Sequence, residues 1–386
     1  MKKRASKLPD VGTTIFTVIS QRAAELGAVN LGQGFPDYPI DPRLTELVTD
    51  AMRAGFNQYA PMPGLPALQQ RIAADSISRH GLAVDPQHEV TITLGATEAI
   101  FSAIQALVGQ GDEVIVFDPA YDSYDPAVRL AGAACVHVPL LPPAFRYDWD
   151  RIRAAVTPRT RMLIINSPHN PACTVMSRDD LQQLAALAEE HDLLVLSDEV
   201  YEHLVYDGIA HASVLSEPAL RPRSLAVYSF GKALHATGLR VGYCIAPAEL
   251  TVELRRVHQF NTFTIATALQ QAIAVYLAEK PGVYSGLPAF FAAKRRLLTE
   301  GLAGSVLRVL PSQGSYFTLV DYSASTMLGD LDDTDAARQL LEQGGVAAIP
   351  LAPFYREPVK HRLLRLCFAK QDATLQQAIG RLRALQ

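Results

Sequence analysis

The sequence predicts an α/β protein, in which a large domain has a mostly parallel sheet flanked by helices and a smaller α+β domain is added. Short β-rich runs alternate with longer helical runs from about residue 90, and the pattern changes to a long helical run after about residue 285. The chain of 386 residues also exceeds one typical core. We expect residues 39–286 to form the large domain, and the N-terminal segment 1–38 with the C-terminal third, 287–386, to form the small one.

The large domain is predicted from its alternating runs. We expect strands at residues 89–94, 112–117, 161–166, 193–198 and 224–230, and helices at residues 96–108 and 180–192. This alternation is typical of βαβ units, whose parallel strands are buried on both faces of the sheet. Ligands of such open sheets bind beyond the carboxyl ends of the strands, so a site is expected where these strands end.

The predicted small domain combines both ends of the chain. Residues 289–304 form a long helical run, and a β-rich stretch at 306–322 follows it. Near the N-terminus a helix is expected at about 14–27, followed by the Gly/Pro-rich turn "NLGQGFPDYP" at 30–39. Because this first segment contains no βα unit, we expect it to pack against the small domain.

The composition is that of a soluble globular enzyme, with 49% hydrophobic and 19% charged residues. The net charge of −4 gives no overall attraction for nucleic acid or for an anionic membrane. No stretch approaches the roughly 18 apolar residues of a membrane helix. The basic start "MKKRASKLPD" has no apolar segment behind it, as a secretory signal would require. We therefore expect a cytoplasmic enzyme with no nucleic-acid or membrane partner.

The cysteines and histidines predict no metal site. The four cysteines are widely scattered and form no CxxC pair: Cys135, Cys173, Cys244 and Cys367. The ten histidines show no HExxH motif and no paired metal spacing. These spacings disfavour both a zinc site and a disulfide framework.

The stretch "TLGATEA" at residues 93–99 predicts an anion site. It follows a predicted strand and begins a helix, so the backbone N–H groups of Gly95, Ala96 and Thr97 would point outward at the positive end of the helix dipole. The alternative is a capped turn between strand and helix, with Thr97 as the cap and no ligand.

A carboxylate stands at the end of another predicted strand. In "LLVLSDEVYEHL" at 193–204, the apolar run ends on Asp198 and Tyr201 follows three residues later, which places both on one side of a helical turn. A carboxylate at the mouth of an apolar strand is costly unless a positive group meets it. The alternative is that Asp198 caps a helix.

Two further strand ends carry residues suited to a flat ligand. Tyr121 in "DPAYDSY" could lay its ring against such a ligand, although a packed loop aromatic is the simpler interpretation. Asn170 in "NSPHNPA" precedes a proline, which restricts the backbone to an extended turn and fixes where the amide points. Such turns are also common without any ligand.

Together with "SFGKALHATGLRVGY" at 229–243, these stretches resemble the pyridoxal-phosphate-dependent aminotransferases of classes I and II, which have fold type I. Six separate stretches agree in order and spacing, and the resemblance covers essentially the whole chain. "LGQGFPDYP", "NQYAPMPG" and "LRLCFAK" are most similar to the branch that contains kynurenine aminotransferases, glutamine transaminase K and bacterial methionine aminotransferases.

The resemblance implies pyridoxal 5'-phosphate as the cofactor. Lys232 would form a Schiff base with its aldehyde and move a proton during the reaction. Ser229 and Arg240 would hold its phosphate together with the amides of residues 95–97. Asp198 would keep the pyridine nitrogen protonated, so that the ring can accept electrons.

Further residues carry over from the same resemblance. Tyr201 and Asn170 would donate hydrogen bonds to the phenolic oxygen of the cofactor, and Tyr121 would stack on its ring. Arg365 in "LRLCFAK" matches the arginine that binds the α-carboxylate of the amino acid, for which a planar guanidinium is well suited.

The resemblance also implies a homodimer with shared active sites. Tyr59 in "NQYAPMPG" would reach the phosphate in the neighbouring subunit. The side-chain pocket would include Phe16 and Gly34, and the partner chain would contribute Phe263. Such an apolar lining favours an L-amino acid such as methionine or phenylalanine over aspartate, with a 2-oxo acid as the second substrate.

One departure from the family pattern lies in the turn after Asn170. The family usually has a glycine two residues after the proline, and "NPACTV" has Cys173 there, which suggests a different local backbone. Ser167 directly before the preceding proline is also a looser match.

The sequence lacks the motifs of other nucleotide-binding and DNA-binding proteins. No GxxxxGK[ST] occurs, "LGQGFP" has only two glycines of a dinucleotide fingerprint, and no basic DNA-binding module precedes the fold. The alternative that stays open is a pyridoxal-phosphate-dependent carbon–sulfur β-lyase, because the same carbanion serves both reactions.

Overall fold

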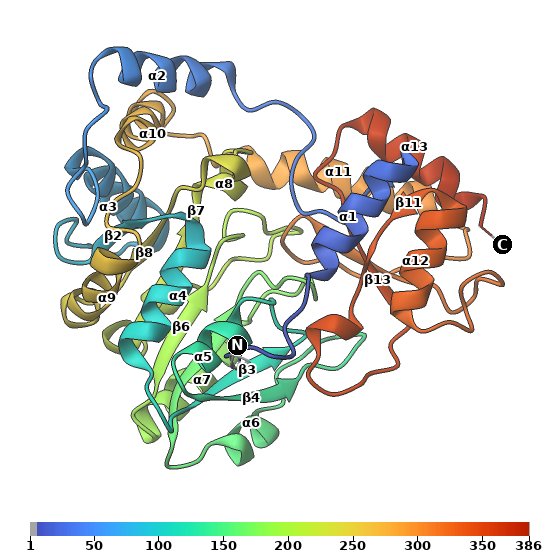
Figure 1. The fold of residues 1–386 in the computed structure, drawn as a ribbon, viewed down its shortest axis with the longest axis horizontal. Coiled ribbons are helices and arrows are strands. Elements are labelled where there is room, and N and C mark those ends of the chain that lie inside the picture. The colour runs from blue at the N-terminus through green and yellow to red at the C-terminus, as the bar shows by residue number, and fades with distance from the viewer. Residues whose placement is uncertain (1–5, 386) are drawn as a thin grey trace, which may run out of the picture.

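The computed structural model describes residues 6–385, and its largest sheet has seven strands in the order β2-β8-β7-β6-β5-β3-β4 (Figure 1). The strands are β2 (Val90–Thr93), β3 (Glu113–Asp118), β4 (Ala134–Pro139), β5 (Thr160–Asn166), β6 (Leu194–Asp198), β7 (Ser224–Ser229) and β8 (Gly242–Ile245). Neighbouring pairs from β4 to β7 are parallel, whereas β8 is antiparallel to both β2 and β7. The prediction of a mostly parallel sheet is confirmed.

The sequence missed two of these strands, β4 and β8. β4 has the sequence "ACVHVP" and lies at the edge of the sheet, so its residues are not all buried and the continuous apolar run is absent. β8 is only four residues long and begins with a glycine. Neither gives the strong pattern that identified the five strands that were predicted.

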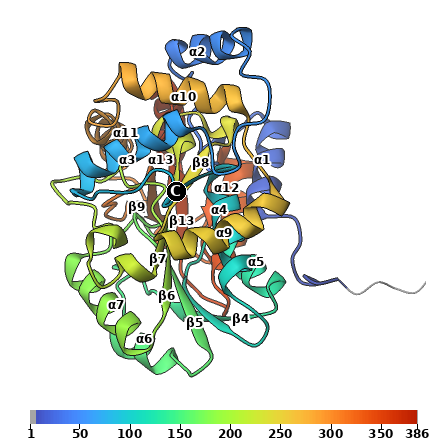
Figure 2. The ribbon, with the colours of Figure 1, turned by 90° about the vertical axis from the view of Figure 1, so that its left-hand side faces the viewer.

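Helices cover both faces of this sheet (Figure 2). On one face lie α4 (Gly95–Leu107), α5 (Tyr124–Leu130) and α9 (Ala248–Asn261). On the other lie α6 (Trp149–Ala155) and α7 (Arg178–Glu190). α7 begins at a capping box in which Ser177 and Asp180 each bond the backbone of the other. Its apolar side, including Leu184, is buried against the sheet.

Three helices pack together beyond the β2 edge of the sheet. They are α2 (Pro42–Arg53), α3 (Pro66–His80) and α10 (Thr267–Glu279). α10 packs against both α2 and α3 (Figure 1). Shorter helical segments are α8 (Phe230–Ala233), η1 (Val214–Ser216), η2 (Arg221–Arg223), η3 (Thr237–Leu239) and η4 (Ala352–Phe354).

The C-terminal part has its own antiparallel sheet in the order β12-β13-β10-β9. Its strands are β9 (Arg308–Val309), β10 (Phe317–Asp321), β12 (Ile349–Pro350) and β13 (Leu363–Cys367). Its helices are α11 (Leu287–Leu302), α12 (Asp333–Gly344) and α13 (Asp372–Arg383).

The N-terminal segment packs against this part. α1 (Ile15–Leu26) lies beside α12 in Figure 1, and β1 (Val29–Asn30) pairs in parallel with β11 (Val346–Ala347). A small apolar core made from both ends of the chain holds the segment, and Ile19 and Ala23 are buried in it. The chain then turns back toward the carboxyl ends of the large sheet.

Candidate active site

A cavity of about 230 Å³ lies at the carboxyl ends of the parallel strands, where the large sheet meets the N-terminal segment and β13. The structure brings most of the predicted site residues to it. Those that line it are Phe16, Gly34, Ala96, Thr97, Tyr121, Asn170, Asp198, Tyr201, Ser229, Lys232, Arg240 and Arg365. Gln33, Phe35, Ile100, Asn166, Val200 and Phe317 complete the lining and were not predicted.

Lys232 projects into the cavity from α8, directly after β7. Its amine lies 5.7 Å from the centre of the Tyr201 ring and 5.8 Å from that of Tyr316. Removal from bulk water and the charge of Arg240 lower the pKa of Lys232 to about 8, against the opposing effect of Asp198. Lys232 forms no ion pair within residues 6–385. A pKa of about 8 leaves roughly one amine in ten neutral at pH 7, far more than for an ordinary lysine, and the neutral form is the one that acts as a nucleophile or base.

Asp198 is the last residue of β6 and is buried. The Tyr124 hydroxyl on α5 donates to Oδ2 at 2.6 Å, and the Val200 N–H donates to Oδ1 at 3.4 Å. Burial raises the pKa of Asp198 to about 6, although these hydrogen bonds act in the opposite direction. The carboxylate is therefore fixed in position and faces the cavity.

Tyr124 is a site residue that the sequence reasoning missed. It stands only three positions after Tyr121, and the two rings meet edge to face at 5.7 Å. The stretch "DPAYDSY" was identified, but nothing in it shows which tyrosine faces the cavity and which reaches Asp198. Burial raises the pKa of Tyr121 to about 12, so both phenols stay protonated near neutral pH.

The turn before α4 forms a cationic cradle with Arg240. Gly95 has a φ of +70°, and a Cβ there would lie only 2.8 Å from Nη2 of Arg240. Glycine is therefore needed for both the conformation and the close approach of the guanidinium. Ala96 and Thr97 line the cavity at the N-terminus of the helix, and Arg240 has no acidic partner among the described residues. This arrangement suits an anion.

Arg365 lies in the middle of β13 and is only 1% exposed. Its Nη1 donates to Oδ1 of Asn170 at 2.6 Å and its Nη2 donates to the carbonyl of Gly32 at 2.7 Å. Its Nε has no hydrogen-bond partner in the described chain. The guanidinium lies 3.9 Å from the centre of the Phe317 ring. A buried cation without an acid is costly, so this one is suited to receive a carboxylate.

Aromatic rings line the part of the cavity near Arg365. Phe16 of α1 lies 5.1 Å from the guanidinium carbon, measured to the ring centre. A Cβ at Gly34 would lie 2.6 Å from the Phe317 ring, so the turn can approach only because this residue is glycine. Tyr316, which the sequence reasoning also missed, donates to the Gly34 carbonyl at 2.5 Å and holds the turn in place.

Tyr201 packs its ring on Tyr316 at 5.0 Å and on Phe317 at 5.9 Å. Burial raises the pKa of its phenol, so it remains a hydrogen-bond donor near neutral pH. The position beside Lys232 results from the turn that follows β6. Asp198 and Tyr201 therefore both reach the cavity, as their spacing predicted.

Two predicted residues, Tyr59 and Phe263, do not line the cavity of their own chain. Their rings meet edge to face at 5.3 Å, and Tyr59 is 82% exposed. Phe260 nearby is 90% exposed. Tyr59 and Phe263 therefore lie together at the surface of the single chain.

Cys173 is buried and has a φ of +63°. This left-handed conformation is the one that glycine adopts readily, so here a cysteine takes a glycine-type backbone rather than changing the turn. Hydrogen bonds from the N–H groups of Gln313 and Gly314 to the Cys173 carbonyl hold it.

The fold and the cavity define a transferase of fold type I, and comparison with known proteins identifies the family. The sequence profile of "Aminotransferase class I and II" matches residues 27–382. The chain belongs to this family and is an aminotransferase. The predictions of the family, the fold type and the enzyme class are confirmed.

Individual relatives agree with this assignment. The methionine aminotransferase of Escherichia coli (strain K12) is 48% identical over 380 residues, covering 98% of each chain. Human kynurenine–oxoglutarate transaminase 1 is 34% identical, covering 98% of this chain and 97% of its own. The solved structure of YbdL from Escherichia coli, described as having a methionine aminotransferase function, superimposes with a TM-score of 0.96 at 47% identity, covering 99% of each chain.

Proposed function

We propose that this enzyme transfers the amino group of an L-amino acid with an apolar or aromatic side chain, such as methionine or phenylalanine, to a 2-oxo acid. The observation that carries the proposal is the buried Arg365, which has no acidic partner and is flanked by Phe16 and Phe317. A carboxylate held there leaves the rest of the amino acid among aromatic rings. The similarity to the Escherichia coli methionine aminotransferase supports this proposal.

A second arginine for a dicarboxylic side chain is missing from the lining formed by the described residues. Arg240 and Arg365 are the arginines of that lining, and Arg240 lies at the anion cradle beside Gly95. A side-chain carboxylate of aspartate would therefore lose its water without gaining a cationic partner. We expect methionine and aromatic amino acids to be preferred.

The proposed cofactor is pyridoxal 5'-phosphate, and the cavity residues fit it. The amides of Gly95, Ala96 and Thr97 would hold the phosphate together with Ser229 and Arg240, whose guanidinium can approach this turn because residue 95 is glycine. Lys232 would bind the aldehyde covalently. When bound, the cofactor supplies an electron sink for the α-carbon of the amino acid.

The side chains of this enzyme would then orient the substrate and move its proton. Arg365 would fix the α-carboxylate, and its bond from Nη1 to Asn170 sets the plane of the guanidinium. Lys232, whose pKa of about 8 leaves part of it neutral, would accept the proton from the α-carbon. Asp198 would face the pyridine nitrogen, Asn170 and Tyr201 the phenolic oxygen, and Tyr121 the ring face.

We further propose a homodimer whose two active sites are shared. The exposed Tyr59 and Phe263 would then reach the cavity of the partner chain, and Tyr59 would contact the phosphate there. The 82% exposure of Tyr59, whose ring contacts that of the 36% exposed Phe263, supports an interface at this surface. We also propose that residues 39–286 form the large domain and that residues 1–38 with 287–386 form the small domain.

The proposed location is the cytoplasm. Within residues 6–385, every helix is too short or too polar to cross a membrane. The substrates proposed above are small molecules, and no nucleic-acid or membrane partner is part of the proposal.

The specificity proposal is tested by measuring kcat/KM for a panel of amino acids against several 2-oxo acids, with release of pyruvate from cysteine conjugates followed in parallel. Methionine and phenylalanine should exceed aspartate by about 10 to 200-fold for each well-buried group. Aspartate as the best donor, or elimination faster than transamination, would overturn it.

The shared-site proposal is tested by co-folding Lys232→Ala protein with Tyr59→Ala protein. If Tyr59 serves the partner chain, a mixed dimer has one site with both native residues and one site that lacks both. Activity per mixed dimer should then rise toward half of the wild-type value. If mixing restores no activity, Tyr59 does not complete the site of the other subunit.

A further inference from the structure

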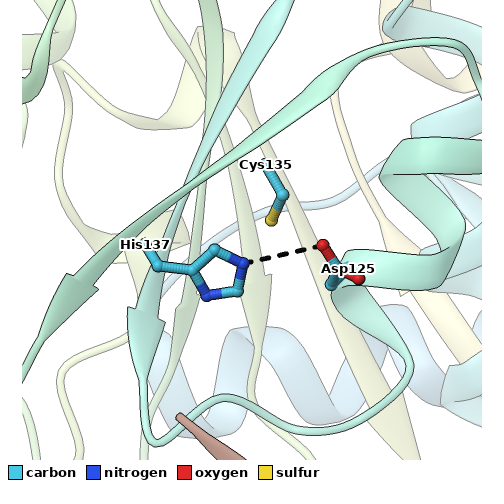
Figure 3. Close-up of side chains that lie close together, drawn as sticks. All are labelled: Asp125, Cys135 and His137. Atoms are coloured by element: carbon cyan, nitrogen blue, oxygen red, sulfur yellow. Dashed lines mark ion pairs between the residues drawn. The ribbon is translucent and has the colours of Figure 1, made fainter. Parts of the chain in front are cut away.

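A second cluster of chemically active side chains lies at the edge of the large sheet, outside the cavity. Asp125 of α5 and Cys135 and His137 of β4 place a carboxylate oxygen, a sulfur and a ring nitrogen within 4.8 Å of one another. Figure 3 shows Cys135 and His137 on the same side of the strand, facing Asp125. Residues two apart on a strand share a face, so the spacing of the cysteine and the histidine produces this pair.

We propose that Asp125, Cys135 and His137 bind a divalent zinc ion, with water as the fourth ligand. The distance from Nε2 of His137 to Oδ1 of Asp125 is 3.6 Å. Zinc bonds of about 2.1 Å to nitrogen and oxygen in a tetrahedron separate two such ligands by about 3.4 Å. The nitrogen and the oxygen are thus already spaced as two ligands of one ion, and the sulfur lies near enough to complete three.

The neighbouring Asp118 orients the histidine as an outer partner would. Oδ1 of Asp118, at the end of β3, lies 2.8 Å from Nδ1 of His137. Its other oxygen accepts a hydrogen bond from the Arg356 N–H at 2.8 Å. Metal-binding histidines usually donate their second nitrogen to a carboxylate in this way, which directs the free nitrogen at the ion.

The nitrogen so directed makes one polar contact with the described residues, the 3.6 Å approach to Oδ1 of Asp125. Nε2 of His137 is buried and forms no hydrogen bond with any described residue. It points into the space bounded by Asp125 and Cys135 (Figure 3). The side chains of Asp125 and His137 keep 25% and 14% of their exposed surface, so an ion can enter from the solvent at the sheet edge.

The local charges are consistent with a divalent cation. Four groups are negative when the thiol is ionised: Asp10, Asp118, Asp125 and Cys135. Two guanidinium groups stand among them, since Arg129 pairs with Asp10 and Asp125, and Arg356 lies 3.7 Å from Asp10. The excess of two negative charges equals the charge of the ion. Formation of the sulfur–zinc and nitrogen–zinc bonds releases two protons to the solvent, one from the Cys135 thiol and one from Nε2 of the His137 imidazolium, so that the ring is neutral in the complex.

A second group of possible metal ligands in the described chain is less suited to bind zinc. Glu199, Glu202 and His211 also place their ligand atoms within 4.8 Å, but the Arg79 guanidinium lies 2.5 Å from Oε2 of Glu202. Oε1 of Glu199 already accepts hydrogen bonds from Ser197, Ser213 and the Val214 N–H. The two carboxylates of this group are therefore already paired with protein donors.

The test is a zinc titration of the holoenzyme in competition with a chromophoric chelator. We expect one tight equivalent per chain, with affinity lowered at least about 10-fold by Cys135→Ser and by His137→Gln, and about 10 to 100-fold by Asp118→Asn. The control is His88→Gln, because His88 pairs with Asp85 at 2.8 Å but with no cysteine, and it should change nothing. Crystals soaked in zinc should show an anomalous peak between the three side chains.

The opposing arrangement is an imidazolium ion held between Asp118 and Asp125, with a protonated thiol and no metal. Absence of tight zinc binding, or binding unchanged in both Cys135→Ser and His137→Gln, would establish that arrangement and overturn the proposal. A thermal scan covers any variant that folds poorly, because zinc should raise the Tm of the wild-type holoenzyme and magnesium should not. An unchanged Tm with zinc would equally contradict the proposed site.

Discussion

Two regions of this protein hold cationic side chains away from bulk water, and they differ in how the lost hydration of these cations is compensated. In the active-site cavity, Lys232, Arg240 and Arg365 form no ion pair with a described carboxylate. In the Glu202 cluster, made of Arg79, His80, Glu202 and His203, every charged group faces an opposite one. Cations in the cavity have no anionic partner in the protein, whereas those in the cluster are paired with Glu202.

This difference distinguishes the buried cations that serve catalysis from the buried charges that stabilise the fold. Although burial alone would raise the pKa of Glu202, Arg79 and the adjacent histidines hold it well below its usual range. The ion pair between Arg79 and Glu202 is therefore a structural element that holds α3 to the turn after β6. Removal of a cavity cation should cost catalysis, and removal of a cluster charge should cost stability.

The largest expected effect is that of Lys232→Ala, which should abolish turnover because no other amine lines the cavity within the described residues. Borohydride should then trap no cofactor on the protein, measured by mass spectrometry of the labelled peptide. Lys280→Ala is the control, because Lys280 pairs with Asp41 at the surface and should keep full activity. Label on another lysine would show that Lys232 is not the reactive amine.

The next effect concerns Asp198→Asn, which should lower kcat by at least about 100-fold while the cofactor still binds, because the lost charge acts most strongly as the reaction proceeds. Asp333→Asn is a matched control. Burial raises the pKa of Asp333 to about 6 as well, but its carboxylate accepts from the N–H groups of Leu351 and Ala352, and none of these three residues lines the cavity. A normal kcat for Asp198→Asn would contradict its role.

A third expectation concerns the Glu202 cluster. Glu202→Gln leaves Arg79 without its partner and should lower the free energy of unfolding by about 3 to 5 kcal/mol. The kcat of the folded fraction should stay within a few-fold of the wild type, as measured after denaturant titration of both proteins. A large loss of kcat with normal stability would place the Glu202 cluster in the catalytic machinery.

The smallest effect is a pH dependence of the apoenzyme. The folded pKa of Lys232, about 8, lies below the value of about 10.5 expected for an unfolded chain, so the unfolded state binds more protons between these values. Stability contributed by Lys232 should therefore rise with pH from about 8 to 10.5, by about 1 to 3 kcal/mol. The measurement is the difference between wild type and Lys232→Met in urea unfolding at several pH values, and no difference in slope would refute the lowered pKa.

The sequence was most informative where a functional residue directly follows a buried strand. Asp198 and Ser229 are the last residues of β6 and β7, and Tyr201 and Lys232 come shortly after them. Their place at the cavity could be predicted because the carboxyl ends of parallel strands meet at one edge. β4 was not predicted, and with it the proximity of Cys135 and His137 to Asp125 was missed. The spacing of one residue between a cysteine and a histidine resembles no familiar metal motif.

By itself, the sequence determined the alternation of strands and helices, the family and the chemical types of the cavity residues, because these depend on local periodicity and short motifs. Only the tertiary structure decided the contacts that make those residues useful. Arg365 donates to the carbonyl of Gly32 across 333 positions, and Tyr124 donates to Asp198 across 74. Such bonds form only after the packing of β13 and α5 has fixed their directions. The physical reason is that hydrogen-bond geometry and loss of solvation are properties of the folded surroundings, which no local stretch contains.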